Sequence, residues 1–403
     1  MRPALWYAGT RLLGLALLVW PETVVLADAT KWLIDLDKLG PSAALPEYPW
    51  PTALLAYLPM YLGVPTIIHY YVAIILGNLA VDALFAWTLW RAGGRAMTSG
   101  MALWLAAFPA LGALWLTRLD LVPSVLAGAA LLALSRARHG GAGVLAAAGT
   151  AFKLWPAVAL PGLLLPGERA ERLRVLAGFL LFAVVVLLAT LAGAGSDRVW
   201  SPVHMQGERG LQIEAFAALP LLWLRFFTSG SAWMVEKSQF CNCHEIYGPG
   251  VSLATFTATL ALVAAAAGLA ALYRRAYRAA PERRSAALAS LLTVLSLMAW
   301  VITAKVFSPQ YMIWLAGLVA ALGALDRAML DIRTLSMFAV ACALTHLVFP
   351  YSYGALVTER HFLQAPALVL LTARDVLVVL LAIRLARGAW RATSPGREKP
   401  RFE

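Results

Sequence analysis

Four acidic residues lie within twenty positions directly after the first apolar stretch, in the segment LADATKWLIDLDKLGPSAALPEYPWP: Asp28, Asp35, Asp37 and Glu47. A carboxylate at the edge of the hydrocarbon is partly desolvated, which raises its pKa toward the range in which it can accept a proton from a hydroxyl. Asp28 stands at this edge and is therefore a candidate general base. The alternative is an N-cap of a helix over 29–39, a position that Asp favours.

The remainder of this segment favours a surface location. Asp35 and Asp37 are two positions apart, so they point about 200° apart on a helix and at least one is expected to be a solvated charge. Tyr48-Pro49-Trp50-Pro51 then precedes an apolar stretch over 52–63 that is too short to cross a membrane. This motif is typical of an interfacial helix with an aromatic belt. It would equally suit a wall against which a sugar ring or lipid headgroup packs.

A second polar segment, GSDRVWSPVHMQGERGLQIEAF, follows Ala194 and precedes an apolar helix expected from Ala217. Arg209 lies shortly before this helix, and its guanidinium fork suits a phosphate or pyrophosphate group. The alternative is a structural ion pair with Glu208 or Glu214. Further polar side chains of the segment are Arg198, His204 and Gln212.

Lysine is costly within apolar sequence, which draws attention to Lys153 and Lys305. Lys153 lies between two short apolar stretches, and Lys305 precedes VFSPQYMIWL near the outer end of an expected span. Each could extend its amine to the membrane surface. Alternatively, both line a cavity and neutralise an anion.

Two further pairs of ionisable residues lie near or inside the expected hydrocarbon, Arg118 with Asp120 and Arg374 with Asp375. The second pair is adjacent in sequence, so its side chains point about 100° apart on a helix. Each is therefore expected to have a partner on another helix, as part of structural packing.

The segment FCNCHEIYGPG combines potential metal ligands at close spacing. Cys-X-Cys-His is a weak metal motif without a second half at a recognisable distance. A bridge between cysteines two apart is also geometrically awkward. No metal site is predicted from Cys241, Cys243, His244 and Glu245.

The amino-acid composition indicates the kind of fold that holds these polar residues in place. Hydrophobic residues make up 61% of the 403 positions, charged residues 13%, and the mean hydropathy is +0.74. These values indicate an integral membrane protein with many spans. The net charge of +12 falls in short clusters between apolar stretches, as orientation signals do, which argues against a nucleic-acid partner.

Apolar stretches bounded by arginine clusters or polar loops predict the membrane spans. We expect them at 11–27, 66–90, 97–116, 121–135, 174–194, 249–273, 286–304, 311–326, 334–350 and 364–386. Two weaker stretches, 141–152 and 155–166, are interrupted at Lys153 and Pro156. They predict a broken pair that enters the membrane and returns to the same side.

Most of the basic residues fall on one side if the N-terminus is cytoplasmic, which predicts an N-in, C-in chain. The segments 28–65, 195–248 and 351–363 then face outward, and their mixed polar composition is typical of functional loops. We expect one domain over 1–388 and a disordered cytoplasmic tail over 389–403. Val25-Leu26-Ala27 also resembles a signal-peptidase site, although Pro21 and Glu22 favour an uncleaved anchor.

Several separated segments carry a family resemblance. In order, they are LADATKW…EYPWP, TRLDLVPSVLAGAALLAL, AFKLWPAVALP, ERGLQIEAFAALPLL and VFSPQYMIWL. Together they resemble the bacterial polyprenyl-phosphate-mannose-dependent mannosyltransferases, glycosyltransferase family 87 of the GT-C superfamily. The resemblance covers roughly residues 1 to 330.

The resemblance implies an all-α polytopic GT-C bundle of about 10–12 spans or half-spans, with extracytoplasmic loop helices, in the bacterial plasma membrane. The active site would face outward. It would transfer a sugar, with mannose as the leading candidate, from a polyprenyl-phosphate donor to a lipid or glycan acceptor. The transfer would invert the anomeric configuration and need no cofactor. Asp28 takes the role of general base, and Lys153, Arg209 and Lys305 become candidates for the donor phosphate. Candidates for sugar or acceptor contacts are Glu47, Tyr48, Trp50, His204, Gln212, Glu214, Gln310 and Tyr311.

This chain departs from the family at two points. Many relatives have Tyr-Pro-Pro where this chain has Tyr48-Pro49-Trp50-Pro51, and members with a late outer histidine differ from FSPQY, which places Gln310 and Tyr311 there. The alternative function is a secondary transporter or a flippase of lipids or lipid-linked sugars, motivated by Arg374, Asp375 and Lys153.

Overall fold

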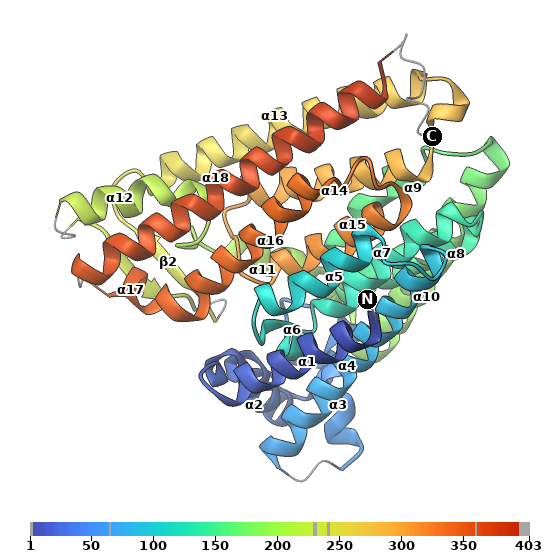
Figure 1. Ribbon diagram of the computed structural model, residues 1–403. Coiled ribbons are helices and arrows are strands. Elements are labelled where there is room, and N and C mark those ends of the chain that lie inside the picture. The colour runs from blue at the N-terminus through green and yellow to red at the C-terminus, as the bar shows by residue number, and fades with distance from the viewer. Residues whose placement is uncertain (1–2, 64–65, 229–231, 240–241, 359–360, 395–403) are drawn as a thin grey trace.

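The computed structural model describes residues 3–63, 66–228, 232–239, 242–358 and 361–394 (Figure 1). Almost all of its regular structure is helical. The α-helices are α1 (Pro3–Val19), α2 (Ala27–Ala43), α3 (Trp50–Tyr61), α4 (Ile67–Ala92), α5 (Ser99–Ala110), α6 (Leu114–Thr117), α7 (Leu121–Ser135), α8 (His139–Phe152), α9 (Leu160–Leu163), α10 (Arg169–Ala194), α11 (Ser196–Glu208), α12 (Leu219–Phe227), α13 (Val251–Arg278), α14 (Ala286–Thr303), α15 (Tyr311–Leu325), α16 (Ile332–His346), α17 (Tyr353–Val357) and α18 (His361–Ala392).

Shorter elements connect these helices. They are η1 (Thr23–Leu26), η2 (Trp155–Ala159), η3 (Phe216–Ala218), η4 (Pro281–Arg283), the π-helical turn η5 (Leu347–Ser352), and the strands β1 (Met234–Lys237) and β2 (His244–Tyr247). The two strands pair antiparallel, with Met234 opposite Tyr247 and Lys237 opposite His244.

Among the described residues, six helical segments are long and apolar enough to cross a membrane: α4, α10, α13, α14, the run 332–357 and α18. The first two helices make a seventh candidate that bends by 87°. The chain is therefore an all-α polytopic membrane protein, as its composition predicts.

Some expected spans differ from the observed helices. The first was expected over 11–27, but α1 ends at Val19 because Pro21 cannot continue its hydrogen bonding. Three other expected spans contain only the short helices α5, α7 and α15, of 12, 15 and 15 residues. These helices are largely buried, so neighbouring protein rather than lipid surrounds their ends.

The core is centred on α15, which packs against α5, α7 and α14. Small residues permit this close approach: a side chain at Gly128 on α7 would meet the carbonyl oxygen of Gly317 on α15. The Ser124 hydroxyl donates to the carbonyl of Ile313 at 2.6 Å in the same interface. The expected break at Lys153 is confirmed, since α8 ends at Phe152 and packs between α7 and α10.

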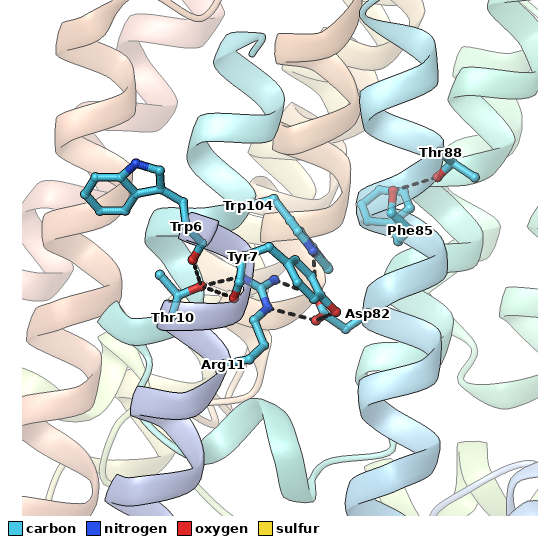
Figure 2. A network of polar contacts seen from close by, with 8 residues as sticks. All are labelled: Trp6, Tyr7, Thr10, Arg11, Asp82, Phe85, Thr88 and Trp104. Atoms are coloured by element: carbon cyan, nitrogen blue, oxygen red, sulfur yellow. Dashed lines mark hydrogen bonds and ion pairs between the residues drawn. The ribbon is translucent and has the colours of Figure 1, made fainter. Parts of the chain in front are cut away.

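A buried ion pair joins α1 to α4 inside the bundle (Figure 2). Arg11 Nε and Nη2 donate to the two carboxylate oxygens of Asp82 at 2.9 and 2.6 Å. The Tyr7 hydroxyl and the Trp104 indole also donate to Asp82, each at 2.7 Å. Arg11 is therefore not a free surface charge, because its side chain is buried and its charge is paired.

The three polar segments expected to face outward gather at the end of the bundle away from the point where α18 ends (Figure 1). Arg198 donates to the Leu45 carbonyl at 3.0 Å, and Asn242 donates to Asp28 at 2.7 Å. At the opposite end α18 continues to Ala392, so the expected tail from residue 389 begins too early. Residues 395–403 of that tail lie outside the described part of the chain.

Candidate functional site

Asp28 lies in the first turn of α2, just past the bend after α1. The helix begins at Ala27 and the Asp28 side chain makes no capping hydrogen bond, so the N-cap alternative is wrong. Its carboxylate instead pairs with the buried guanidinium of Arg118 and accepts a hydrogen bond from Asn242. The Asp28 side chain is still 17% exposed, which leaves it accessible from the surface.

The other acids of this segment differ from Asp28. Asp35 pairs with Lys31 one turn earlier on α2, and Asp37 is exposed. The expectation that at least one of them is a solvated surface charge is therefore confirmed. Glu47 is half-buried, in the turn before α3.

A second, fully buried carboxylate, Asp120, follows Arg118 by two residues. Oδ1 of Asp120 accepts from Lys153 Nζ at 2.9 Å and from the Trp314 indole at 2.6 Å. Oδ2 of Asp120 has no hydrogen-bond partner in the described part of the chain. Lys153 therefore has an acidic partner inside the bundle and does not extend to the membrane surface.

Aromatic rings surround the Lys153 amine. Its Nζ lies 4.3 Å from the centre of the Tyr48 ring and 5.3 Å from that of Trp314. Tyr311 stacks on Trp314 with ring centres 3.8 Å apart. Gln310 precedes Tyr311 and is half-buried. Tyr48, Lys153 and Tyr311 are thus brought together around Trp314, with Gln310 next to Tyr311 in the chain.

Trp50 is not part of this aromatic group. A side chain at Gly193 on α10 would meet the Trp50 ring, so Trp50 packs against that helix. Pro51 does lie in the first turn of α3, as expected. The interfacial-helix interpretation fits Trp50, whereas Tyr48 lies on the Lys153 cluster.

Arg209 is a half-buried cation without an acidic partner among the residues that the structure describes. Its Nε is buried and makes no hydrogen bond within that part of the chain. The alternative, an ion pair with Glu208 or Glu214, is wrong, because Glu214 pairs with Arg374 and Glu208 lies against His204. The charge of Arg209 acts on Lys153, Tyr311 and Lys305, which places all four groups in one neighbourhood.

Lys305 anchors the loop that carries Arg209. Its Nζ donates to the Gly207 carbonyl at 2.8 Å, and its own carbonyl accepts from the Gln212 amide at 3.0 Å. Gln212 itself is buried and its Oε1 has no hydrogen-bond partner among the described residues. Lys305 is therefore directed at this loop.

Glu214 and His204 lie apart from this cluster. The Arg374 guanidinium donates to the Glu214 carboxylate at 3.0 Å and to its carbonyl at 2.6 Å, with both side chains fully buried. Asp375 pairs with the same Arg374, at 2.8 Å, so the expectation of separate partners on other helices is wrong for Asp375. The His204 side chain is 76% exposed.

The segment after β1 supports the loop rather than a metal. The Glu245 carboxylate accepts from the Gly210 amide at 2.9 Å, the Ser238 hydroxyl at 2.8 Å and the Tyr247 hydroxyl at 2.7 Å. Cys243 is disulfide-bonded, and Cys241 lies outside the described residues. Within the described ranges, no group of three or more His, Cys, Asp or Glu could hold a metal ion.

A third acidic residue at this end of the bundle, Glu22, was not predicted from the sequence. Glu22 accepts from the Ala113 amide at 2.7 Å and from the Tyr351 hydroxyl at 2.8 Å, and lies 2.7 Å from Nε2 of His346. A side chain at Gly112 would collide with these groups, and its φ of +62° also favours glycine. The sequence feature that could have indicated Glu22 is its position next to Pro21 at the end of an apolar run.

Comparison with protein families, with curated proteins and with solved structures finds no match for this chain.

The buried Glu214 predicts a pH-dependent stability. Burial raises its pKa from the ordinary 4.5 to about 7, although Arg374 opposes the rise. An acid with a raised pKa stabilises the fold fully below its unfolded pKa, and this contribution is lost as the pH rises through the folded value. The thermal unfolding temperature in detergent is expected to fall between pH 5 and pH 8, and Glu214→Gln should flatten that slope.

Glu208→Gln is the matched control, since Glu208 lies on the surface close by in the chain. It should keep the wild-type slope. An unchanged slope in Glu214→Gln would assign the pH dependence to other groups.

Proposed function

We propose that this protein is a GT-C-type membrane glycosyltransferase. It moves a sugar from a polyprenyl-phosphate donor to a lipid or glycan acceptor at the extracytoplasmic face, and mannose is the leading candidate for this sugar. The observation that carries the proposal is that an accessible carboxylate, Asp28, and a cation without an acidic partner among the described residues, Arg209, lie at the same end of the bundle. The family resemblance of the quoted segments supports the same activity.

The proposed reaction is a single inverting displacement. The acceptor hydroxyl attacks the anomeric carbon, the bond from that carbon to the phosphate oxygen breaks, and the acceptor proton passes to the Asp28 carboxylate. The ion pair with Arg118 fixes the direction of this carboxylate. The polyprenyl phosphate leaves as an anion, so nearby cations lower the barrier by stabilising the charge that develops.

Of the three residues that are candidates for binding the donor phosphate, Arg209 is the most available. Lys153 already shares its charge with Asp120, and Lys305 is bonded to the Gly207 carbonyl. Arg209 has no such acidic competitor among the described residues, and its fork can bind two phosphate oxygens. We assign the donor phosphate to Arg209, with Lys153 and Lys305 adding positive potential nearby.

The sugar and acceptor would contact the aromatic group and its polar neighbours. Glu47 and Gln310 are half-buried and accessible, whereas their chain neighbours Tyr48 and Tyr311 are only 5% and 3% exposed and form the wall behind them. Buried aromatic rings behind the polar groups exclude water, which limits hydrolysis of the donor. Glu214 and Trp50 contact other groups and His204 is exposed, so these three are no longer favoured for this role, whereas Gln212 Oε1 has no partner among the described residues and stays a candidate.

The transporter alternative has weaker support. The intramembrane charges that motivated it have protein partners: Arg374 binds Glu214 and Asp375, and Lys153 binds Asp120.

The direct test is sugar transfer by the purified protein. It is incubated in detergent with synthetic polyprenyl phosphates that carry radiolabelled mannose, arabinose or glucose, together with a membrane lipid extract as acceptor. Transfer of label to a new lipid or glycan supports the proposal and identifies the sugar. Labelled free sugar alone, or no product with any donor, would contradict it.

Arg209→Gln should weaken use of the donor. Charge-assisted hydrogen bonds contribute about 1.5–3 kcal/mol, so we expect the KM for the donor to rise roughly 10- to 100-fold. Lys38→Gln, an exposed cation on α2, is the matched control and should leave the KM unchanged. A donor KM that is equal in both variants would remove Arg209 from the phosphate role.

A further inference from the structure

A large basic cavity lies at the other end of the bundle, beside the ends of α13 and α18 (Figure 1). Its volume is about 1030 Å³. Its charged and aromatic lining consists of Arg274, Arg275, Arg278, Glu282, Arg283 and Trp390. Four arginines against one acid make this a site for an anion.

One of these arginines is held rigidly in the wall. The Arg275 guanidinium stacks on the Trp390 ring at 4.0 Å. Its Nε donates to the Thr393 hydroxyl at 3.0 Å and its Nη2 to the Ser394 hydroxyl at 2.8 Å. These neutral partners fix the guanidinium without cancelling its charge, so the cavity wall keeps a positioned cation.

Two other arginines are available to a ligand. Arg274 and Arg278 are exposed, and neither has an ion-pair or hydrogen-bond partner in the described part of the chain. They are four residues apart, one helical turn, on the same face of α13. Two adjacent guanidinium forks on one face can together bind a phosphate group.

The same face of α13 continues as an apolar stripe. Ala267, Ala270 and Ala271 line the cavity one to two turns before the arginines. Further along, Leu260 and Val263 are 52% and 62% exposed, and none of the membrane-spanning window of α13 is buried inside the protein. An apolar helix face of this kind is solvated by lipid chains.

We propose that this cavity binds the headgroup of an acidic phospholipid. The phosphate lies between Arg274 and Arg278, next to the fixed Arg275, and an acyl chain follows the alanine and Leu260–Val263 stripe. A soluble phosphate would use the arginines alone, whereas the continuity of cavity and apolar stripe matches a lipid. Basic pockets between membrane helices are known to recognise anionic headgroups. This proposal does not depend on the catalytic assignment.

The test is native mass spectrometry of the full-length protein in detergent, titrated with phosphatidylglycerol or phosphatidylcholine of equal chain length. The wild type should retain phosphatidylglycerol preferentially. Arg274→Gln/Arg278→Gln should weaken that binding roughly 25-fold, from about 1 kcal/mol for each arginine. Arg136→Gln/Arg138→Gln, an exposed pair without partners in the described residues and outside the cavity, should bind as the wild type does.

Two further measurements distinguish a bound lipid from a free phosphate and from general surface charge. Ala271→Phe fills the cavity while keeping every charge and should also weaken phosphatidylglycerol binding. Inorganic phosphate at millimolar concentration should not displace the lipid. Equal losses in both arginine pairs, full binding by Ala271→Phe, or displacement by inorganic phosphate would each overturn the proposal.

Discussion

Asp28→Asn is expected to lower the rate of sugar transfer by roughly 10²- to 10⁴-fold, the usual contribution of a positioned general base. An amide cannot take the acceptor proton, yet it has nearly the same shape as the carboxylate. It can still accept the hydrogen bond from Asn242, so the local geometry should persist. The measurement is kcat with saturating donor and acceptor, using the sugar that the donor panel identifies.

This change also removes the charge partner of Arg118, whose side chain is only 6% exposed. Loss of activity must therefore be separated from loss of structure, by thermal unfolding and size-exclusion chromatography of the same preparation. A variant that unfolds like the wild type but transfers no sugar supports a catalytic Asp28.

Asp35→Asn is the matched control, because Asp35 lies on the same helix and forms only a partly exposed ion pair with Lys31. It should retain wild-type turnover. If Asp28→Asn retained full activity as well, the general base would have to be another group, and the fully buried Asp120 would be the next to test.

The helices could be predicted from the sequence to a large extent. Every apolar stretch expected to span the membrane contains a helix, because a backbone in lipid must satisfy its hydrogen bonds internally. The break at Lys153 was also predictable, since a cation and Pro156 interrupt the apolar run. Span length was less predictable, because α5, α7 and α15 are surrounded by protein and need not match the lipid thickness.

The long-range charge pairs, both inside the bundle and near the candidate site, could not be predicted in the same way. Arg11 and Asp82 are 71 positions apart, and Glu214 and Arg374 are 160 apart. No local pattern links such residues, since their contact depends on how whole helices pack. The pairs decide which side chains are available to a ligand: Arg374 occupies Glu214, and this leaves Arg209 without the acid that the sequence offered it.

The largest effect on stability is expected at the Arg11–Asp82 pair. Asp82 is fully buried and accepts hydrogen bonds from Arg11, Tyr7 and Trp104, so Asp82→Leu leaves a buried cation and two other donors without an acceptor (Figure 2). Removing one partner of a buried ion pair costs about 3–5 kcal/mol. We expect little folded protein, or a much lower unfolding temperature in detergent.

A double variant distinguishes a structural pair from a functional one. Arg11→Leu/Asp82→Leu removes both charges, so it should be more stable than Asp82→Leu alone, because apolar replacements for a buried pair are often tolerated. If the double variant folds, it should also transfer sugar. Arg11 and Asp82 join α1 to α4, and their hydrogen bonds are made to other side chains of the protein. A double variant as unstable as the sum of both single changes would mean that each charge has another essential partner. A stable but inactive double variant would place this pair in the reaction itself.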